Sequence, residues 1–266
     1  MKHIFSKQNR ALLSELVRTD FKLRYQGSVL GYAWSLLRPL LLFVILYIVF
    51  VKFLKLGTDI PNYPIYLLLG IVLWSFFTEM TSQSLGAIVG RGDLIRKIRI
   101  PRWLIIVSTS ISALISLTLN LTVVLVLAII SGMNFLATSV GLPLVLLEIY
   151  LLALGVSLIL SALYVKYRDV SYIWEVVLQA GFYLTPILYP LSKVTDVNIQ
   201  KLLLLNPMAQ AIQDARNMFV THQTITNATV FNSQFTRLIP ISIVFVVLLV
   251  GVAYFKKESK NFAENL

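Results

Sequence analysis

Residues 103–130 read WLIIVSTSISALISLTLNLTVVLVLAII and contain no charged side chain. A helix needs about 20 predominantly apolar residues to cross the roughly 30 Å hydrocarbon core of a bilayer. This stretch is longer than that, and it is also longer than the usual helix of a globular domain. It therefore predicts a transmembrane α-helix.

The composition of the whole chain leads to the same class of protein. Of the 266 residues, 58% are apolar and 13% are charged, whereas about 25% of the residues of a soluble domain are charged. So few charges could not easily cover a soluble globule, which excludes a soluble enzyme and a disordered chain. The chain has no cysteine, which excludes disulfide scaffolds, thiolate metal sites and cysteine nucleophiles.

Five further apolar runs lie before and after residues 103–130, so we predict six spans in an all-α integral membrane protein. The spans are expected at about 36–53, 64–85, 103–130, 140–165, 172–191 and 238–255. We expect a single transmembrane domain over residues 1–266. It would consist of an interface helix and lead at 1–35, spans one to five at 36–191, exterior helices at 192–237, span six at 238–255 and a tail at 256–266.

The basic residues predict the orientation of these spans. Lys and Arg concentrate in cytoplasmic loops, and 17 of the 23 basic residues fall at the two termini and in alternate loops. Both termini are therefore expected in the cytoplasm, and the net charge of +11 reflects topology before any partner. A polar, basic lead precedes the first span, so no cleavable signal peptide is expected.

Two cytoplasmic segments have an amphipathic pattern. Residues 9–24 place Leu13, Leu16 and Val17 on one helical face, which predicts a helix along the membrane interface. It serves either as an anchor or as a docking element. Residues 90–103, GRGDLIRKIRIPRW, form a basic loop that either rests on anionic headgroups or fits a groove in a soluble partner.

The exterior segment between residues 190 and 240 contains a helix start signal. Asn206 followed by Pro207 predicts a helix that runs to about Phe219, because Asn caps a helix and Pro suits its first position. Neither this helix nor the stretch before it is long enough to span. We expect a pair of short helices that re-enter the outer leaflet beside a cavity, with a helix lying flat on the leaflet as the alternative.

A polar and aromatic stripe marks the fifth span. Its members follow helical spacing and are Tyr172, Glu175, Gln179, Phe182, Tyr183, Pro186 and Tyr189. Lipid disfavours such a stripe, so it should face protein or water. In the first span Tyr32, Phe43, Tyr47 and Phe50 share a face. Aromatic rings can stack on the faces of sugars, although they also form ordinary interface belts.

Other intramembrane polar residues have structural explanations. Ser108, Ser112, Ser116 and Asn120 lie four apart, a spacing that favours close helix packing or a subunit interface over a substrate path. Glu79 and Glu148 have no matching intramembrane Lys or Arg in the sequence. Structural acids are expected there, with a proton relay as the alternative.

Catalytic groups are scarce. The only histidines are His3 and His222, so neither a histidine metal cluster nor a histidine-based triad can form. The chain has no GxxxxGK[ST] motif and therefore no P-loop for ATP. Any energy source must lie on another polypeptide or in an ion gradient.

Four blocks in the sequence resemble the transmembrane subunit of bacterial polysaccharide ABC exporters. They are RYQGSVLGYAW at 24–34 with Pro39 after it, YRDV at 167–170, FYLTPILYP at 182–190 and LNPM at 205–208. The blocks lie in family order over nearly the whole chain. The resemblance covers O-antigen, capsule and teichoic-acid exporters alike.

The resemblance implies a homodimer in the bacterial inner (cytoplasmic) membrane, bound to two copies of a separate P-loop ATPase. That ATPase would hold the ATP and Mg²⁺, and this chain no cofactor, no metal and no nucleic acid. A glycan on a polyprenyl diphosphate lipid would leave through a channel. The resemblance makes 90–103 the coupling helix, with Asp93, Ile95, Arg96 and Arg99 at the ATPase, and makes the helices after Pro190 the exterior gate.

Channel and lipid contacts follow from the same resemblance. Arg24 and Arg38 would steer the diphosphate, because Arg presents a planar fork to phosphate oxygens, with positive-inside topology as the alternative. The channel would be lined by Tyr32, Trp34, Phe43, Tyr47, Phe50, Tyr172, Gln179, Phe182, Tyr183 and Tyr189. Competing functions are an ABC permease for a small lipid or drug, and a membrane enzyme acting on polyprenyl-linked sugars through Asp93, Asp169 and Glu175. An ion-coupled transporter is disfavoured, because no inverted repeat is visible.

Overall fold

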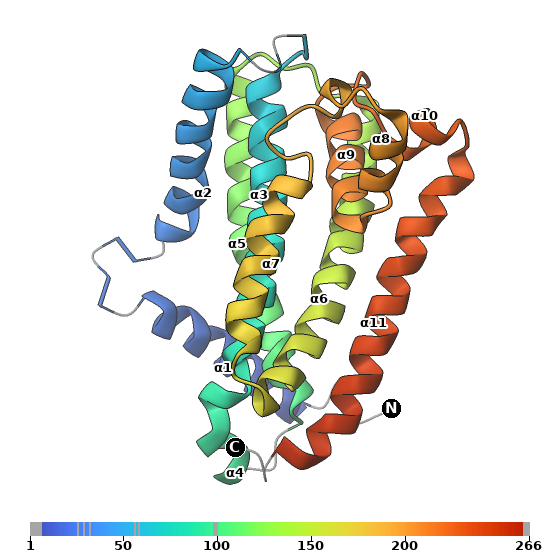
Figure 1. Cartoon of the computed structure of the whole chain (residues 1–266). Coiled ribbons are helices and arrows are strands. Elements are labelled where there is room, and N and C mark those ends of the chain that lie inside the picture. The colour runs from blue at the N-terminus through green and yellow to red at the C-terminus, as the bar shows by residue number, and fades with distance from the viewer. Residues whose placement is uncertain are drawn as a thin grey trace.

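The computed structural model describes residues 7–25, 27–28, 30–31, 33–55, 57, 59–97 and 101–262, and in these ranges every regular element is helical. Figure 1 shows long helices running side by side as a bundle. They are α2 (Ala33–Leu46, continued by a π-helical segment Tyr47–Phe53), α3 (Tyr63–Ala87), α5 (Trp103–Ile130), α6 (Leu142–Lys166), α7 (Val170–Leu184) and α11 (Leu238–Glu258). Short 3-10 turns precede α6 (Ala137–Gly141) and α11 (Gln234–Arg237).

Five helical segments among the described residues are long and apolar enough to cross a membrane. They are Ala33–Phe53, Tyr63–Ala87, Trp103–Ile130, Ala137–Lys166 and Phe235–Asn261. The fifth predicted span differs, because α7 has 15 residues and ends at Leu184, about 22 Å at 1.5 Å per residue. Thr185 is extended, since the proline after it disfavours helical backbone. The prediction of a helix continuing to residue 191 is therefore wrong beyond Leu184.

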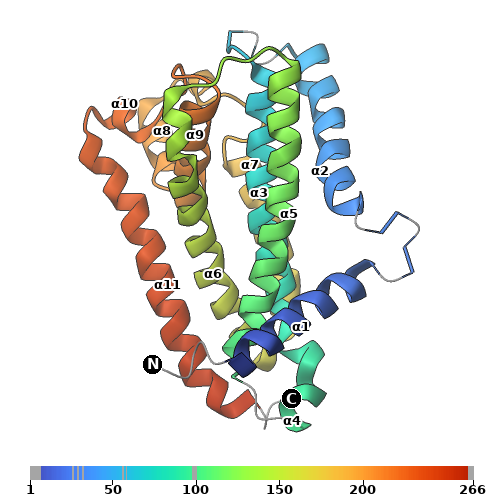
Figure 2. The same cartoon turned by 180° about the vertical axis from the view of Figure 1, so that it is seen from behind.

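The remaining helices gather at the two ends of the bundle. At one end, α1 (Lys7–Tyr25) lies across the bundle, together with α4 (Gly92–Lys97) and the last turns of α11 (Figures 1 and 2). The predicted helix over residues 9–24 is thereby confirmed. The opposite end holds α8 (Val197–Leu204), α9 (Pro207–Phe219) and α10 (Asn227–Phe231). The basic segments that the sequence assigns to the cytoplasm thus collect at the end that carries α1 and α4.

The main hydrophobic core surrounds α3. Leu67, Leu68, Leu69, Ile71 and Leu73 of this helix are all fully buried, and α3 packs against α5, α6, α7 and α9. By contrast, α2 buries only Ser35 and Pro39. The helix α2 is therefore a loosely packed outer wall, whereas α3 is the centre of the fold.

A close crossing joins α6 to α11. A Cβ atom added at Gly251 would lie 2.4 Å from the carbonyl oxygen of Gly155, and one at Gly155 would lie 2.8 Å from the Cα atom of Leu248. Small residues let two membrane helices approach until their backbones touch. Two glycines therefore set the distance between these helices.

The helix α9 begins where the sequence predicts. The side chain of Asn206 accepts a hydrogen bond from the backbone nitrogen of Met208 at 3.0 Å, and Pro207 occupies the first helical position. Most of α9 is buried, including Ala209, Ile212 and Ala215, and it packs against α6 and α3. The helix is thus part of the core of the bundle and does not lie flat on its surface.

Candidate functional site

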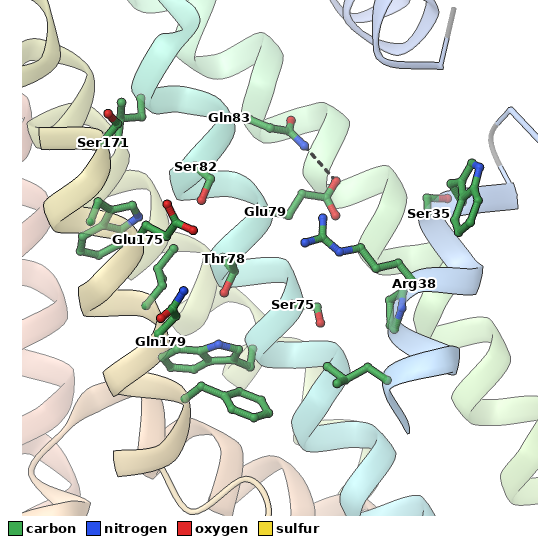
Figure 3. Close-up of a pocket in the computed structure, with 18 of the residues that line it drawn as sticks. Ser35, Arg38, Ser75, Thr78, Glu79, Ser82, Gln83, Ser171, Glu175 and Gln179 are labelled. Atoms are coloured by element: carbon green, nitrogen blue, oxygen red, sulfur yellow. Dashed lines mark hydrogen bonds between the residues drawn. The ribbon is translucent and has the colours of Figure 1, made fainter. Parts of the chain in front are cut away.

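A cavity of about 740 Å³ opens between α2, α3 and α7. Figure 3 shows its polar side chains converging from these three helices. Its lining consists of Trp34, Ser35, Arg38, Pro39 and Leu42 from α2, Trp74, Ser75, Thr78, Glu79, Ser82, Gln83 and Leu85 from α3, and Ser171, Trp174, Glu175, Leu178, Gln179, Phe182 and Tyr183 from α7. The volume lies within the range of ligand-binding clefts in proteins.

The α3 wall carries a ladder of polar side chains. Its members are Ser75, Thr78, Glu79, Ser82 and Gln83, which share one helical face because they lie zero, three, four, seven and eight positions from Ser75. The amide nitrogen of Gln83 donates to Glu79 Oε1 at 3.2 Å. This ladder was not predicted from the sequence, although its helical spacing inside an apolar span is a signal that could have revealed it.

Aromatic side chains line the other parts of the cavity. Trp174 is held in place by a hydrogen bond from its Nε1 to Thr81 Oγ1 at 3.2 Å. The rings of Trp74 and Phe182 lie 6.2 Å apart, and a Cβ atom on Gly181 would come within 2.8 Å of Trp74 Cη2. The rings of α3 and α7 therefore meet closely at the end of the cavity nearest α9.

Charged groups enter the cavity from all three walls. Arg38 comes from α2, Glu79 from α3 and Glu175 from α7. In Figure 3 the guanidinium of Arg38 points toward the carboxylate of Glu79. The sequence offers no intramembrane Lys or Arg to match Glu79, and in the structure Arg38, from the N-terminal part of α2, reaches the same cavity.

Half of the predicted channel residues lie elsewhere. Trp34, Gln179, Phe182 and Tyr183 line the cavity with Arg38, whereas the other described members of that set do not. Phe43, Phe50 and Tyr189 are partly buried against the main core. The ring of Tyr47 lies 5.8 Å from that of Phe43, and Tyr172 is 72% exposed on the outside of the bundle. Tyr32 lies outside the described residues.

Only some of the residues predicted to contact the diphosphate or the ATPase at the α1 and α4 end have described side chains. Arg24 belongs to the last turn of α1 and Arg96 to α4, but their side chains are not among those described, and Arg99 lies outside the described residues. Asp93 is exposed in the first turn of α4. Ile95 is buried in a cluster with Ile88 and Ile105, so in this structure it packs within the chain.

The serine stripe of α5 packs inside the chain, as the packing interpretation predicted. Ser108 Oγ donates to Asp20 Oδ2 of α1 at 3.1 Å, and Asn120 Nδ2 donates to the backbone oxygen of Ser35 at 3.1 Å. Both are buried. Side chains of this stripe therefore form hydrogen bonds that attach α1 and α2 to α5.

Arg216 lies in the helix that the sequence predicts over residues 206–219, but its burial is not predicted from the sequence. It is fully buried in α9, where its guanidinium donates to the backbone oxygens of Tyr66 at 2.9 Å, Pro186 at 2.6 Å and Ile187 at 2.8 Å. The next carbonyl, that of Leu188, accepts from the hydroxyl of Tyr63 at 2.8 Å. We call Arg216 and Tyr63 the exterior clamp, because they hold three consecutive carbonyls after α7.

The exterior clamp needs a glycine beside it. A Cβ atom on Gly70 would lie 2.4 Å from Arg216 Nη2, and the guanidinium stacks over the ring of Tyr66 at 3.8 Å. Removal from water lowers the pKa of Arg216. The three carbonyls and the ring replace the lost water, so neutral groups accommodate the buried cation.

A second charge cluster, with a buried Asp214 and a partly exposed Arg237, lies beside the exterior clamp. Arg237 Nε lies 2.9 Å from Asp214 Oδ2, and the amide of Gln210 donates to the same carboxylate. Burial raises the pKa of Asp214, while Arg237 and Gln210 act to lower it. Glu148 of α6 is close enough to interact electrostatically with both Asp214 and Arg237. Arg237, from the turn before α11, thus acts on Glu148 although the two residues are far apart in the sequence.

No group of three or more potential His, Cys, Asp or Glu metal ligands occurs in the part of the chain that the structure describes. The lining of the cavity consists of hydrogen-bonding hydroxyls and amides, aromatic rings and three charged side chains. Such a lining can bind and orient a polar molecule with apolar faces.

Comparison with known proteins identifies the family. Residues 11–220 match the model of the family described as ABC-2 type transporter. The chain is 31% identical over 261 residues to the O-antigen export system permease protein RfbA of Myxococcus xanthus, covering 97% of this chain and 96% of that protein. It is 29% and 30% identical over 256 residues to two proteins of the same name from Klebsiella pneumoniae. The chain therefore belongs to the ABC-2 type transporter family, as a multi-pass membrane protein.

Proposed function

We propose that this chain is the channel-forming membrane subunit of an ATP-driven exporter for a lipid-linked, O-antigen-like polysaccharide. The observation that carries the proposal is the cavity between α2, α3 and α7, with its polar ladder and its aromatic rings. Relatives that align over nearly their whole length are named as O-antigen export permeases, which supports the choice of substrate.

The lining suits a sugar chain. Pyranose rings have apolar faces that stack on aromatic side chains and hydroxyls that need hydrogen-bonding partners. Trp34, Trp74 and Trp174 supply rings, while Ser75, Thr78 and Gln179 supply hydroxyls and an amide. These contacts are individually weak and repeat along the cavity, which suits a polymer that has to move past them.

The membrane arrangement is part of the proposal. We place α7 together with residues 185–190 as the fifth of six crossings, since α7 alone is too short. The helices α8 and α9 then re-enter the exterior leaflet as a gate, and the end with α1 and α4 faces the cytoplasm. Irregular backbone such as 185–190 is tolerated at membrane depth when its polar groups are bound by protein, and the exterior clamp binds three of its carbonyls.

The partners follow the family. A homodimer of this chain would bind two P-loop ATPase subunits, which carry the ATP and Mg²⁺. The α4 segment would contact the ATPase through Asp93, Arg96 and Arg99, with Ile95 anchoring it to the chain. Arg24 and Arg38 would meet the diphosphate of the lipid carrier in the bacterial inner (cytoplasmic) membrane.

The proposal is tested by deleting the gene and following lipid-linked polymer with a glycan-specific antibody. We expect polymer to accumulate at the cytoplasmic leaflet and a plasmid copy to restore export. A copy with Thr78→Trp, which fills the cavity, should not restore it, whereas Leu249→Trp on the exposed side of α11 should. Continued export without the chain would contradict the proposal, as would covalent change of a lipid-linked sugar by the purified chain alone.

A further inference from the structure

We propose that Glu79 competes with the phosphate groups of the lipid carrier for Arg38, and so keeps this phosphate site weak enough to release its ligand. The inference rests on the proposed function, in which a lipid diphosphate reaches the cavity. It adds a role for a carboxylate that the proposed function leaves without one.

The first observation is where the two side chains lie. Arg38 and Glu79 project from neighbouring helices, α2 and α3, and line the same cavity. Their charged ends point toward each other in Figure 3. Gln83 donates to Glu79 Oε1 at 3.2 Å, which holds the carboxylate on the polar ladder. Glu79 is thus built into the wall that Arg38 faces.

The second observation is the charge of the cavity. Its described lining has one arginine, Arg38, and two carboxylates, those of Glu79 and Glu175. A diphosphate therefore enters a site whose single cation already faces an anion. The net charge of this lining disfavours long residence of a phosphate, although the arginine provides a place for it to pause.

A carboxylate opposite Arg38 is useful because the transported lipid has to leave the site. An arginine and a phosphate form paired, charge-assisted hydrogen bonds, and these strengthen where water is excluded. A transport path needs binding that is favourable enough to admit the substrate and weak enough to let it leave. An arginine without a nearby carboxylate would hold the lipid diphosphate too long. Glu79 lowers that affinity by taking back the guanidinium as the phosphate departs.

The loose packing of α2 allows the exchange. Arg38 is exposed and only Ser35 and Pro39 of α2 are buried, so the guanidinium can turn between Glu79 and a ligand without disturbing the core. Glu79 is on α3, the most buried of the five helices long and apolar enough to span a membrane, and so stays in place. The moving partner is therefore Arg38 and the fixed partner is Glu79.

The chain offers a matched control. Glu175 also lines the cavity but comes from α7, on the side of Figure 3 away from α2. Glu79→Gln and Glu175→Gln each remove one negative charge without changing side-chain length. The Gln at position 79 keeps an oxygen that can accept from Gln83. A general charge effect would act in both variants, whereas competition for Arg38 acts in Glu79→Gln alone.

The experiment measures binding of farnesyl diphosphate to the full-length chain in nanodiscs of zwitterionic lipid, with farnesol as the probe that lacks phosphate. We expect Glu79→Gln to bind the diphosphate about tenfold more tightly, the scale of one charge interaction in a partly buried site, and Glu175→Gln less than about twofold more tightly. Arg38→Gln should weaken binding, and adding Glu79→Gln to it should no longer strengthen it. Farnesol binding should not change.

Further measurements keep the inference open to refutation. Glu79→Asp withdraws the carboxylate by one methylene and should tighten binding by less than Glu79→Gln, which serves as the second variant if Glu79→Gln is poorly folded. Equal tightening in Glu79→Gln and Glu175→Gln, or none in either Glu79 variant, overturns the inference.

Two further measurements distinguish a failure of this inference from a failure of the proposed function. Phosphatidylglycerol added to the nanodiscs should not displace farnesyl diphosphate. If it displaces the probe fully, the ligand is an ordinary anionic headgroup, and the lipid-diphosphate part of the inference is overturned. Loss of export in the gene deletion, together with unchanged binding in Glu79→Gln, would refute the competition and leave the export function standing.

Discussion

The two ends of the bundle are held together by different kinds of contact. At the α9 end, Arg216 is fully buried and donates to three backbone carbonyls. At the α1 end, the charged contacts are side-chain ion pairs that keep some exposure: the side chains of Arg91 and Asp20, which pair with each other, are 18% and 15% exposed, and Lys166 Nζ lies 2.9 Å from Glu258 Oε2. Breaking a buried charge arrangement costs about 3–5 kcal/mol and exposed ion pairs contribute about 0–1 kcal/mol, so these pairs should fall between the two values.

The contrast indicates where the protein can move. Segments joined by the exterior clamp, which are α3, α9 and the chain after α7, cannot separate without stranding a buried cation. The helices α1 and α2 bury few of their described side chains, namely those of Leu16, Ser35 and Pro39. Motions that accompany transport are therefore expected to begin at the α1 and α4 end, and α3 and α9 should move as one body.

The largest expected effect comes from Arg216→Ala. It leaves the carbonyls of Tyr66, Pro186 and Ile187 without their donor, and we expect a loss of about 3–5 kcal/mol in the free energy of unfolding. Thermal unfolding of the purified chain in detergent measures this. Lys193→Ala is the control, because Lys193 is an exposed exterior cation paired with Asp59. Equal loss in both variants would remove the distinction between the two ends.

Gly70→Ala tests the exterior clamp without touching its charge. The new Cβ would lie 2.4 Å from Arg216 Nη2, so either the guanidinium or α3 has to shift, at a cost of about 1–3 kcal/mol. Gly86→Ala provides the matched control on the same helix, since nothing lies within 4 Å of its Cβ position. We expect this control to be neutral or slightly stabilising, because alanine favours helix. If Gly70→Ala is equally harmless, the guanidinium is not held where the structure places it.

Asp20→Asn should give the smallest loss of stability. It removes the ion pair with Arg91, whose side chain is 18% exposed, but keeps an oxygen that can accept from Ser108, so we expect a loss of about 1 kcal/mol, between the values for exposed and buried pairs. Proteolysis of α1 in the intact membrane should nevertheless become faster, because this pair ties α1 to the turn before α4. Glu15→Gln, on an exposed position of the same helix, should change neither quantity. A loss as large as that of Arg216→Ala would show that the two ends are held equally firmly.

The polar ladder and α7 are features that the spacing of residues in the sequence can predict. Helical spacing identified the α7 stripe, and it would have identified Ser75, Thr78 and Glu79 by the same rule. The place where α7 stops was also within reach, because Thr185 precedes a proline. What spacing could not tell is which of these faces meet. The cavity depends on α2, α3 and α7 lying together, and no local pattern encodes their order around the bundle.

The sequence by itself determined the properties that arise from neighbouring residues. Long apolar runs predict membrane helices, the distribution of Lys and Arg predicts which end faces the cytoplasm, and Asn206 with Pro207 predicts the start of α9. Only the tertiary structure decided that Arg216 is buried and that Arg38 faces Glu79. Arg216 and Tyr66 are 150 residues apart, and whether a charge is exposed or buried depends on such distant partners replacing the water around it.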